Sequence, residues 1–114
     1  MKDLRTSSRI RDLAIESIIS QSDALKVVAS SIDSSFEDAV KLIHKSKGRV
    51  IITGIGKSAI IASKIVATLN STGTPSIFMH AADAIHGDLG LVQENDIIIC
   101  ISKSGNTPEI KILL

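Results

Sequence analysis

Two short loops carry the residues in this sequence that are best suited to chemistry. The first is Gly54-Ile55-Gly56-Lys57-Ser58, and the second is Ser102-Lys103-Ser104-Gly105-Asn106-Thr107. Each follows a run of β-branched apolar residues, which predicts a buried strand. The first loop offers close backbone approach, a cation and a hydroxyl, and the second offers three hydroxyls and an amide. Together they predict a binding site for an anion such as a phosphate monoester.

The first loop also resembles three different kinds of turn. A Walker A loop needs a glycine five positions before Gly56, where Ile51 stands, so an ATP-type P-loop is disfavoured. A dinucleotide fingerprint fits slightly better, because Gly54, Gly56 and Ala59 match G-x-G-x-x-A, but the next strand ends at His80 without the acidic residue that holds a ribose. A tight turn with a solvated lysine also fits the loop taken alone.

Strands that alternate with helices are expected to position these loops. Periodicity predicts a long amphipathic helix over 10–32 and a second helix from Ser34 to Gly48, where Ser34 and Glu37 have capping-box spacing. The remaining predicted elements are strands over 49–53, 75–79 and 96–101, a helix over 58–71, a helical turn over 81–85 and a last helix capped by Thr107. This order indicates an α/β fold, a three-layer αβα sandwich around a parallel sheet. Ligands of such sheets bind beyond the carboxyl ends of the strands.

Composition narrows the class of protein. Apolar residues make up 44% of the 114 residues, with two Phe and no Trp or Tyr, so the core is expected to be aliphatic. Thirteen basic and twelve acidic residues give a net charge of +1, which argues against nucleic acid or an acidic membrane as a partner. Cys100 is the single cysteine, so an intrachain disulfide is impossible. No leader-like segment and no apolar run of about 18 residues is present, and we expect a cytoplasmic protein.

The segment from His80 to Gly90 contains two histidines and two aspartates. We expect no metal there, because histidines and aspartates in loops are more often solvated or capping, and the spacing is not that of a tight ligand set. A histidine is a better candidate for proton transfer. His44 is expected to complement a helix dipole, and Arg49 and Lys103 are expected to be exposed charges.

The motifs taken together resemble one family. They are Gly-Ile-Gly-Lys-Ser (54–58), Ser-Thr-Gly-Thr-Pro-Ser (71–76), His-Gly-Asp-Leu-Gly (86–90) and Ser-Lys-Ser-Gly-Asn-Thr-Pro-Glu-Ile (102–110). Their order and spacing are similar to those of the arabinose-5-phosphate isomerases of the KpsF/GutQ type, which carry a SIS (sugar isomerase) domain. The resemblance implies a flavodoxin-like sheet over 47–114, with residues 1–46 as a helical segment packing on it. It also implies interconversion of D-ribulose 5-phosphate and D-arabinose 5-phosphate for Kdo or capsule synthesis, a homotetramer, and no organic cofactor.

The resemblance also assigns candidate site residues. Those matching the phosphosugar-binding loops are Gly54, Gly56, Ser58, Ser102, Ser104, Gly105 and Thr107. Lys57, His86 and Glu109 match residues placed in the active site. Isomerisation through an enediolate needs a base, a donor beside the developing oxyanion and a proton shuttle. We therefore expect Glu109 to be the base or shuttle, Lys57 the electrophile, and His86 the group for ring opening or proton relay.

Two features depart from the family pattern. Lys103 stands where relatives commonly have asparagine, and Ala81 stands where they commonly have proline. The chain also stops shortly after its third predicted strand, which suggests a truncated SIS domain with half of a catalytic set. A non-catalytic phosphosugar-binding or regulatory module, or an inactive fragment, is therefore an alternative to the isomerase.

Overall fold

The computed structural model describes residues 7–114, and the chain divides into two compact units, 1–39 and 40–114. The first unit contains helix α1 (Ser7–Ser30), so the predicted long helix is confirmed within the described residues. It ends where the hydroxyls of Ser30 and Ser31 donate to the carbonyl oxygens of Val27 and Val28, each at 2.7 Å. Such side-chain bonds satisfy carbonyls that the end of a helix leaves without a partner. The prediction for residues 1–6 of the N-terminal segment lies outside the described residues.

Helix α2 (Ser34–Lys45) begins where the sequence predicted, but with a different cap. The Asp33 carboxylate accepts the backbone N–H of Ser35 at 2.9 Å and the Ser35 hydroxyl at 2.6 Å. These bonds to Ser35 lower the pKa of Asp33. Asp33 is thus the N-cap, and the expectation that Ser34 opens a capping box is wrong. An aspartate has the stronger acceptor for a helix N-terminus, because its charge also complements the helix dipole.

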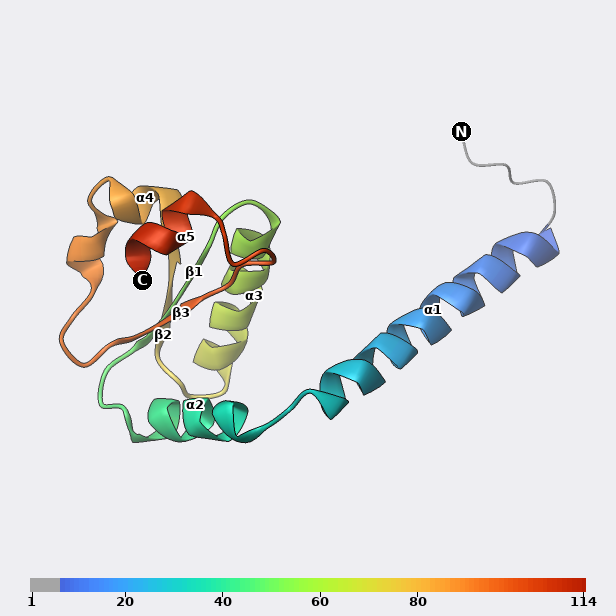
Figure 1. Ribbon diagram of the computed structural model, residues 1–114, viewed down its shortest axis with the longest axis horizontal. Helices are drawn as coiled ribbons and strands as arrows, with labels where there is room; N and C mark the ends of the chain where they lie inside the picture. The colour runs from blue at the N-terminus through green and yellow to red at the C-terminus, as the bar shows by residue number, and fades with distance from the viewer. Residues whose placement is uncertain (1–6) are drawn as a thin grey trace. The chain divides into compact units, whose positions relative to one another are not determined.

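The second unit is built on a three-stranded parallel sheet in the order β2-β1-β3 (Figure 1). The strands are β1 (Val50–Gly54), β2 (Ser76–His80) and β3 (Ile97–Cys100). In the central strand, Val50 is in register with Ser76 on one side and with Ile97 on the other. All three strands were predicted, and β1 and β2 each end one residue later than expected. The shift matters at β2, because it places His80 inside the strand, in register with Gly54.

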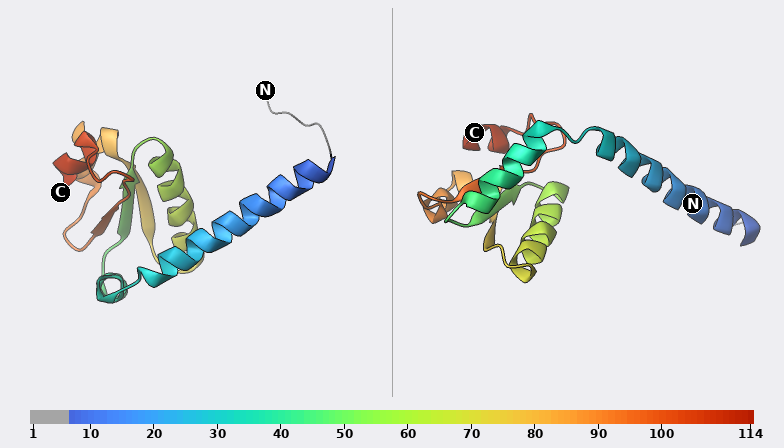
Figure 2. Two further views of the ribbon diagram at one scale, coloured as in Figure 1. Left: turned by 45° about the vertical axis from the view of Figure 1, so that its right-hand side comes forward. Right: turned by 90° about the horizontal axis from the view of Figure 1, so that it is seen from below.

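Helices cover both faces of this sheet, which confirms the three-layer αβα arrangement (Figure 2). Helix α3 (Lys57–Ser71) lies on the face that carries Val50 and Ile52, and Ala62 is its fully buried contact. Helices α4 (Ala81–Ile85) and α5 (Pro108–Leu113) lie on the other face, with Ile51 in their core. The short helix η1 (Asp88–Leu91) leads back to β3. Each face therefore carries an apolar cluster between the sheet and its helices.

An ion pair closes the amino edge of the sheet, which corrects the expectation that Arg49 is an exposed charge. Its guanidinium bonds both carboxylate oxygens of Asp96, and its backbone N–H donates to the same carboxylate at 2.8 Å. The Arg49 side chain is 25% exposed and that of Asp96 1%. The Arg49 guanidinium holds the pKa of the Asp96 carboxyl well below its usual range. This pair joins the start of β1 to the start of β3.

Candidate functional site

The carboxyl ends of the three strands bring the loops predicted to do chemistry to one edge of the sheet. Gly54, His80 and Cys100 end β1, β2 and β3, respectively. The chain leaves β1 for α3 on one face, and it leaves β3 for α5 on the opposite face. A parallel sheet in which neighbouring strands lead to opposite faces has a crevice between the two loops, and ligands bind there. The loops after β1 and β3 flank this crevice.

The first loop depends on two glycines. A Cβ on Gly54 would stand 3.0 Å from the Ser58 carbonyl carbon, so the first turn of α3 packs directly on the strand. Gly56 has φ +61°, a conformation that side-chain-bearing residues rarely adopt, and it occupies the N-cap position without a side chain to fill it. Ala59 donates to the Gly56 carbonyl oxygen at 3.1 Å, which leaves the N–H groups of Lys57 and Ser58 without an intrahelical acceptor. The amino end of this 15-residue helix therefore offers donors to an anion.

The second loop is fixed by its own hydroxyls. The N–H of Gly105 donates to the Ser102 hydroxyl oxygen at 3.0 Å, and the N–H of Asn106 donates to that of Ser104 at 3.1 Å. The hydroxyl oxygens of Ser102 and Thr107 lie 3.2 Å apart. Thr107 is the N-cap residue of α5, as predicted, but its hydroxyl contacts Ser102 and does not cap the helix. Hydrogen bonds within the loop thus join Ser102 to Gly105 and Thr107, and Ser104 to Asn106.

These bonds leave hydroxyl hydrogens available to a ligand. The Ser104 oxygen accepts from the backbone, so its own O–H is free to donate. Ser102 and Thr107 share one O–H donor between them, and the other O–H has no partner within the loop. Ser58, half-buried on the first turn of α3, adds another hydroxyl. Hydroxyl donors and open backbone N–H groups match the acceptor oxygens of a phosphate.

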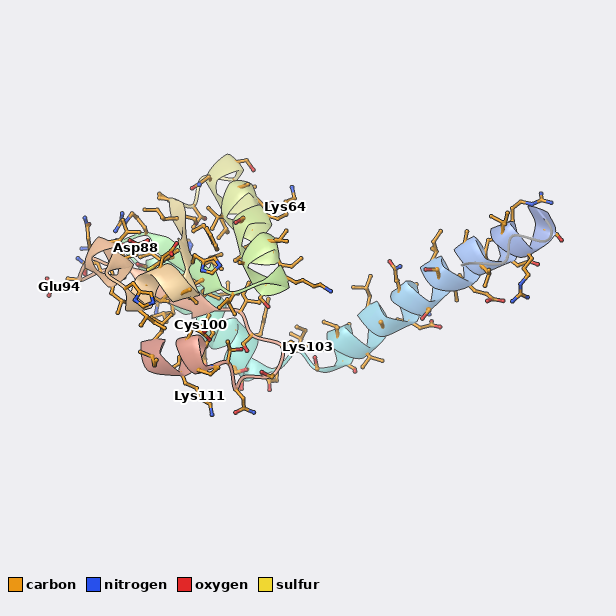
Figure 3. All side chains as sticks on the ribbon, turned by 90° about the horizontal axis from the view of Figure 1, so that it is seen from above. Lys64, Asp88, Glu94, Cys100, Lys103 and Lys111 are labelled. Carbon is orange, nitrogen blue, oxygen red and sulfur yellow. The ribbon has the colours of Figure 1, made fainter. Side chains whose placement is uncertain are left out.

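The residues expected to do proton chemistry are less tightly held. Lys57 is exposed at the start of α3, His86 is exposed at the end of α4, and Glu109 is half-buried on the first turn of α5. Among residues 7–114, no hydrogen bond or ion pair joins any two of these three side chains. Lys103 is exposed in the loop between β3 and α5, as predicted (Figure 3). The structure therefore defines the hydroxyl-rich loop, whereas the assignments of Lys57, His86 and Glu109 stay predictions.

Two polar groups lie below the loops on the α5 side of the sheet. Thr53 is fully buried, and its hydroxyl has no hydrogen-bond partner among the described residues. Cys100, its register neighbour on β3, is half-buried, and burial raises the pKa of its thiol. A thiol that stays protonated is a poor nucleophile and a poor metal ligand. Cys100 therefore behaves as a small apolar residue.

The carboxyl end of β2 carries a residue that the sequence motifs did not single out. His80 accepts the N–H of Ala82 through its Nδ1 atom at 3.2 Å and so caps α4. His80 is the last residue of a strand at the carboxyl edge of the sheet, and this position could have identified it as a candidate site residue. No group of three or more metal-ligating side chains occurs in the described part of the chain.

A groove of about 440 Å³ lies at the other edge of the sheet. Its lining includes His44, Val50, Gly73 and Pro75, from the amino end of β1, the last turn of α2 and the α3–β2 turn. We assign the functional site to the carboxyl edge in spite of this groove, because the hydroxyl donors, Lys57 and Glu109 all lie on the loops and helix starts there. Among residues 7–114, no helix combines the length and apolar character needed to cross a bilayer.

Comparisons with known proteins identify the family of this chain. The sequence profile of the SIS domain family matches residues 42–114. Arabinose 5-phosphate isomerase KdsD of Pseudomonas aeruginosa is 46% identical over 92 residues, which cover 81% of this chain and 28% of that protein. Arabinose 5-phosphate isomerase KpsF of Escherichia coli O6:H1 is 47% identical over 96 residues, covering 83% of this chain and 29% of the relative. The chain thus spans about three tenths of the length of these relatives.

Solved structures show the same fold. An E. coli CFT073 protein in complex with arabinose 5-phosphate matches with a TM-score of 0.89 and 40% identity, over 96% of this chain and 58% of the other. A sugar-phosphate isomerase structure from Listeria monocytogenes matches with a TM-score of 0.87 and 30% identity, over 95% of this chain and 57% of the other. The parallel sheet and its helices are therefore those of phosphosugar isomerases with this domain.

Proposed function

This chain belongs to the SIS domain family, and we propose that it binds a five-carbon sugar phosphate at the carboxyl edge of its sheet. The observation that carries the proposal is the set of three hydroxyls on Ser102, Ser104 and Thr107, which hydrogen bonds within the loop hold in place and which keep O–H donors free. It flanks the crevice opposite the open N–H groups of Lys57 and Ser58. The phosphate of the ligand would take its place between these two sets of donors, with Gly54, Gly56 and Gly105 allowing the backbone to come close.

We propose further that the site serves interconversion of D-arabinose 5-phosphate and D-ribulose 5-phosphate, the reaction named for the KdsD and KpsF relatives. A base removes the proton from C2 of the open-chain aldose, and the electron pair forms an enediolate between C1 and C2. Return of the proton to C1, with transfer of a proton from O2 to O1, gives the ketose. Glu109 is the proposed base or shuttle, Lys57 the cation beside the developing oxyanion, and His86 the group for ring opening or proton relay. We extend the proposal to a cytoplasmic homotetramer in Kdo or capsule synthesis.

A binding module without turnover is the second candidate. It is favoured by the contrast within the site, where the hydroxyl loop is bonded but Lys57, His86 and Glu109 make no bond with one another among the described residues. The chain spans about three tenths of the length of its curated relatives, and the isomerase activity named for them is that of the whole proteins. The two candidates share the binding site and differ only in turnover.

Calorimetric titration with D-arabinose 5-phosphate tests the binding proposal. Removing the Ser104 hydroxyl should weaken binding by about 10- to 150-fold, since a hydrogen bond to a charged group contributes about 1.5–3 kcal/mol. Ser63→Ala removes a hydroxyl from an exposed position of α3 and is the matched control. Equal affinities for the wild type, Ser104→Ala and Ser63→Ala would show that the loop is not the phosphate site.

Turnover is tested by following the aldose and ketose in the same samples. Conversion that falls by orders of magnitude in Glu109→Gln, with the affinity for the sugar phosphate retained, supports the isomerase. Unchanged turnover in Glu109→Gln would remove Glu109 from the mechanism. Ligand-induced stabilisation with no conversion by the wild-type chain would favour the binding module.

A further inference from the structure

The imidazole of His80 is a polar group at the carboxyl edge that the proposed function leaves without a role. His80 ends β2 and is half-buried. Its Nδ1 accepts the N–H of Ala82, and its ring stands edge-on to Phe78, with centroids 6.2 Å apart and planes at 89°. Two contacts therefore fix both the rotamer and the plane of the ring. A ring fixed in this way presents its other nitrogen, Nε2, in a set direction.

The bond to Ala82 also fixes which nitrogen carries the hydrogen. Nδ1 can accept an N–H only through its lone pair, so the neutral ring has its hydrogen on Nε2. Within residues 7–114, Nε2 has no hydrogen-bond partner. His80 therefore holds an N–H donor that is oriented but unused by the described part of the protein. This donor is open to a ligand or to water.

The neighbours of His80 place this donor beside the first loop. Its register partner on β1 is Gly54, and adjacent strands are about 4.8 Å apart. Gly54 has no side chain to fill the space above the strand, and the first turn of α3 packs on it at Ser58. Since Phe78 belongs to the face that α3 covers, and His80 is two residues further along the strand, the imidazole is on the α3 side as well.

We propose that His80 is a further substrate-binding residue, whose Nε2–H donates to a hydroxyl or carbonyl oxygen of the sugar while the hydroxyl-rich loop after β3 holds the phosphate. This inference rests on the proposed function, because the two contacts must belong to one ligand. β2 and β3 flank the central strand, so their loops are about 10 Å apart across the sheet. A phosphosugar lies between them with its phosphate at the β3 loop and its sugar oxygens toward β2. His80 would then contact the sugar part of the ligand.

Two substitutions separate this role from capping. In His80→Asn, the amide oxygen takes the place of Nδ1 and accepts the Ala82 N–H, but no donor remains at the position of Nε2. In His80→Gln, a longer amide brings an N–H donor near the position of Nε2 and leaves the cap of α4 weaker. If His80 served only as a cap, His80→Asn would behave as the wild type and His80→Gln would be the impaired variant.

The measurement is the affinity for D-arabinose 5-phosphate and for inorganic phosphate, with thermal unfolding as the control for folding. We expect His80→Asn to unfold as the wild type does, to bind inorganic phosphate equally, and to bind the sugar phosphate about 3- to 10-fold more weakly, as for the loss of one hydrogen bond. His80→Gln should recover part of this affinity. Equal affinity of His80→Asn and wild type for the sugar phosphate would overturn the role of His80 and leave the proposed function intact. Failure of the wild type to bind the sugar phosphate would overturn both.

Discussion

Replacing Ile110 with alanine tests whether α5 holds the hydroxyl-rich loop in place. Ile110 is 2% exposed and is the buried residue of this helix, whereas Ile112, on the same helix, is 64% exposed. The two positions have the same side chain and the same secondary structure. A comparison of Ile110→Ala with Ile112→Ala therefore isolates the effect of burial.

The magnitude follows from the buried volume that is lost. Isoleucine loses its carbons beyond Cβ on becoming alanine, and at about 0.8 kcal/mol for each buried carbon this transfer term is about 2.4 kcal/mol. A cavity adds to it, and measured Ile→Ala changes in cores are about 2–5 kcal/mol. We expect Ile110→Ala to cost about 2.5–4 kcal/mol and Ile112→Ala to cost less than about 0.5 kcal/mol.

Native-state hydrogen exchange of the Lys111 amide is the suitable assay. This N–H donates to the Thr107 carbonyl oxygen at 3.0 Å, so it reports whether α5 is formed beside the loop. Because α5 has only six residues and Ile110 is its buried one, it can open without unfolding of the sheet. Exchange should accelerate strongly in Ile110→Ala and hardly change in Ile112→Ala, and the affinity for the sugar phosphate should fall only in the first. Similar exchange in the two variants would refute the view that burial of Ile110 positions the loop.

Two further predictions concern the amino edge of the sheet. Asp96→Asn should flatten the acid limb of a stability profile, because the Arg49 guanidinium lowers the pKa of Asp96 in the folded state. The stability that this lowered pKa contributes is present above the unfolded-state value of about 3.9 and is lost as pH falls below it. The free energies of unfolding of wild type and Asp96→Asn, measured in urea, should therefore converge in acid. A constant difference between the two proteins across this pH range would contradict the pairing. Gly48→Ala places a Cβ 2.0 Å from the Asn95 carbonyl oxygen and should lower the free energy of unfolding by about 1–3 kcal/mol through overpacking, which urea unfolding measures. Gly90→Ala, whose Cβ meets nothing within 4 Å, should leave the unfolding midpoint unchanged. Equal midpoints for the two variants would show that the backbone at Gly48 moves aside without cost.

Local patterns were sufficient to predict the sheet and the two loops. The β-branched run before Gly54 and the glycines after it identify a buried strand and its turn without reference to the rest of the chain. The same holds for the apolar run before Ser102. These features depend on residues that are adjacent in sequence, and the structure confirms them.

Features that depend on register could not be predicted in the same way. Arg49 and Asp96 are 47 positions apart, and they meet only because both flank the amino ends of neighbouring strands. His80 was placed one residue beyond its strand, and that shift hid its pairing with Gly54. The prediction of the N-cap of α2 was wrong for a local reason, since residue spacing alone does not say whether Asp33 or the serine after it is the N-cap.

The strand order also has a consequence for the time course of folding. β1 is central but comes first in the chain, so its pair Val50–Ser76 closes 26 residues and its pair Val50–Ile97 closes 47. The longer closure costs about 0.5 kcal/mol more in chain entropy. We therefore expect the β1–α3–β2 unit to form first, and pulsed hydrogen exchange during refolding should protect the Met79 amide, which faces β1, before the Ile99 amide. Simultaneous protection would mean that the sheet assembles as one unit. If the order holds, the chain forms the loop at Gly54 before it can form the hydroxyl-rich loop, and the proposed ligand can bind only after β3 has paired.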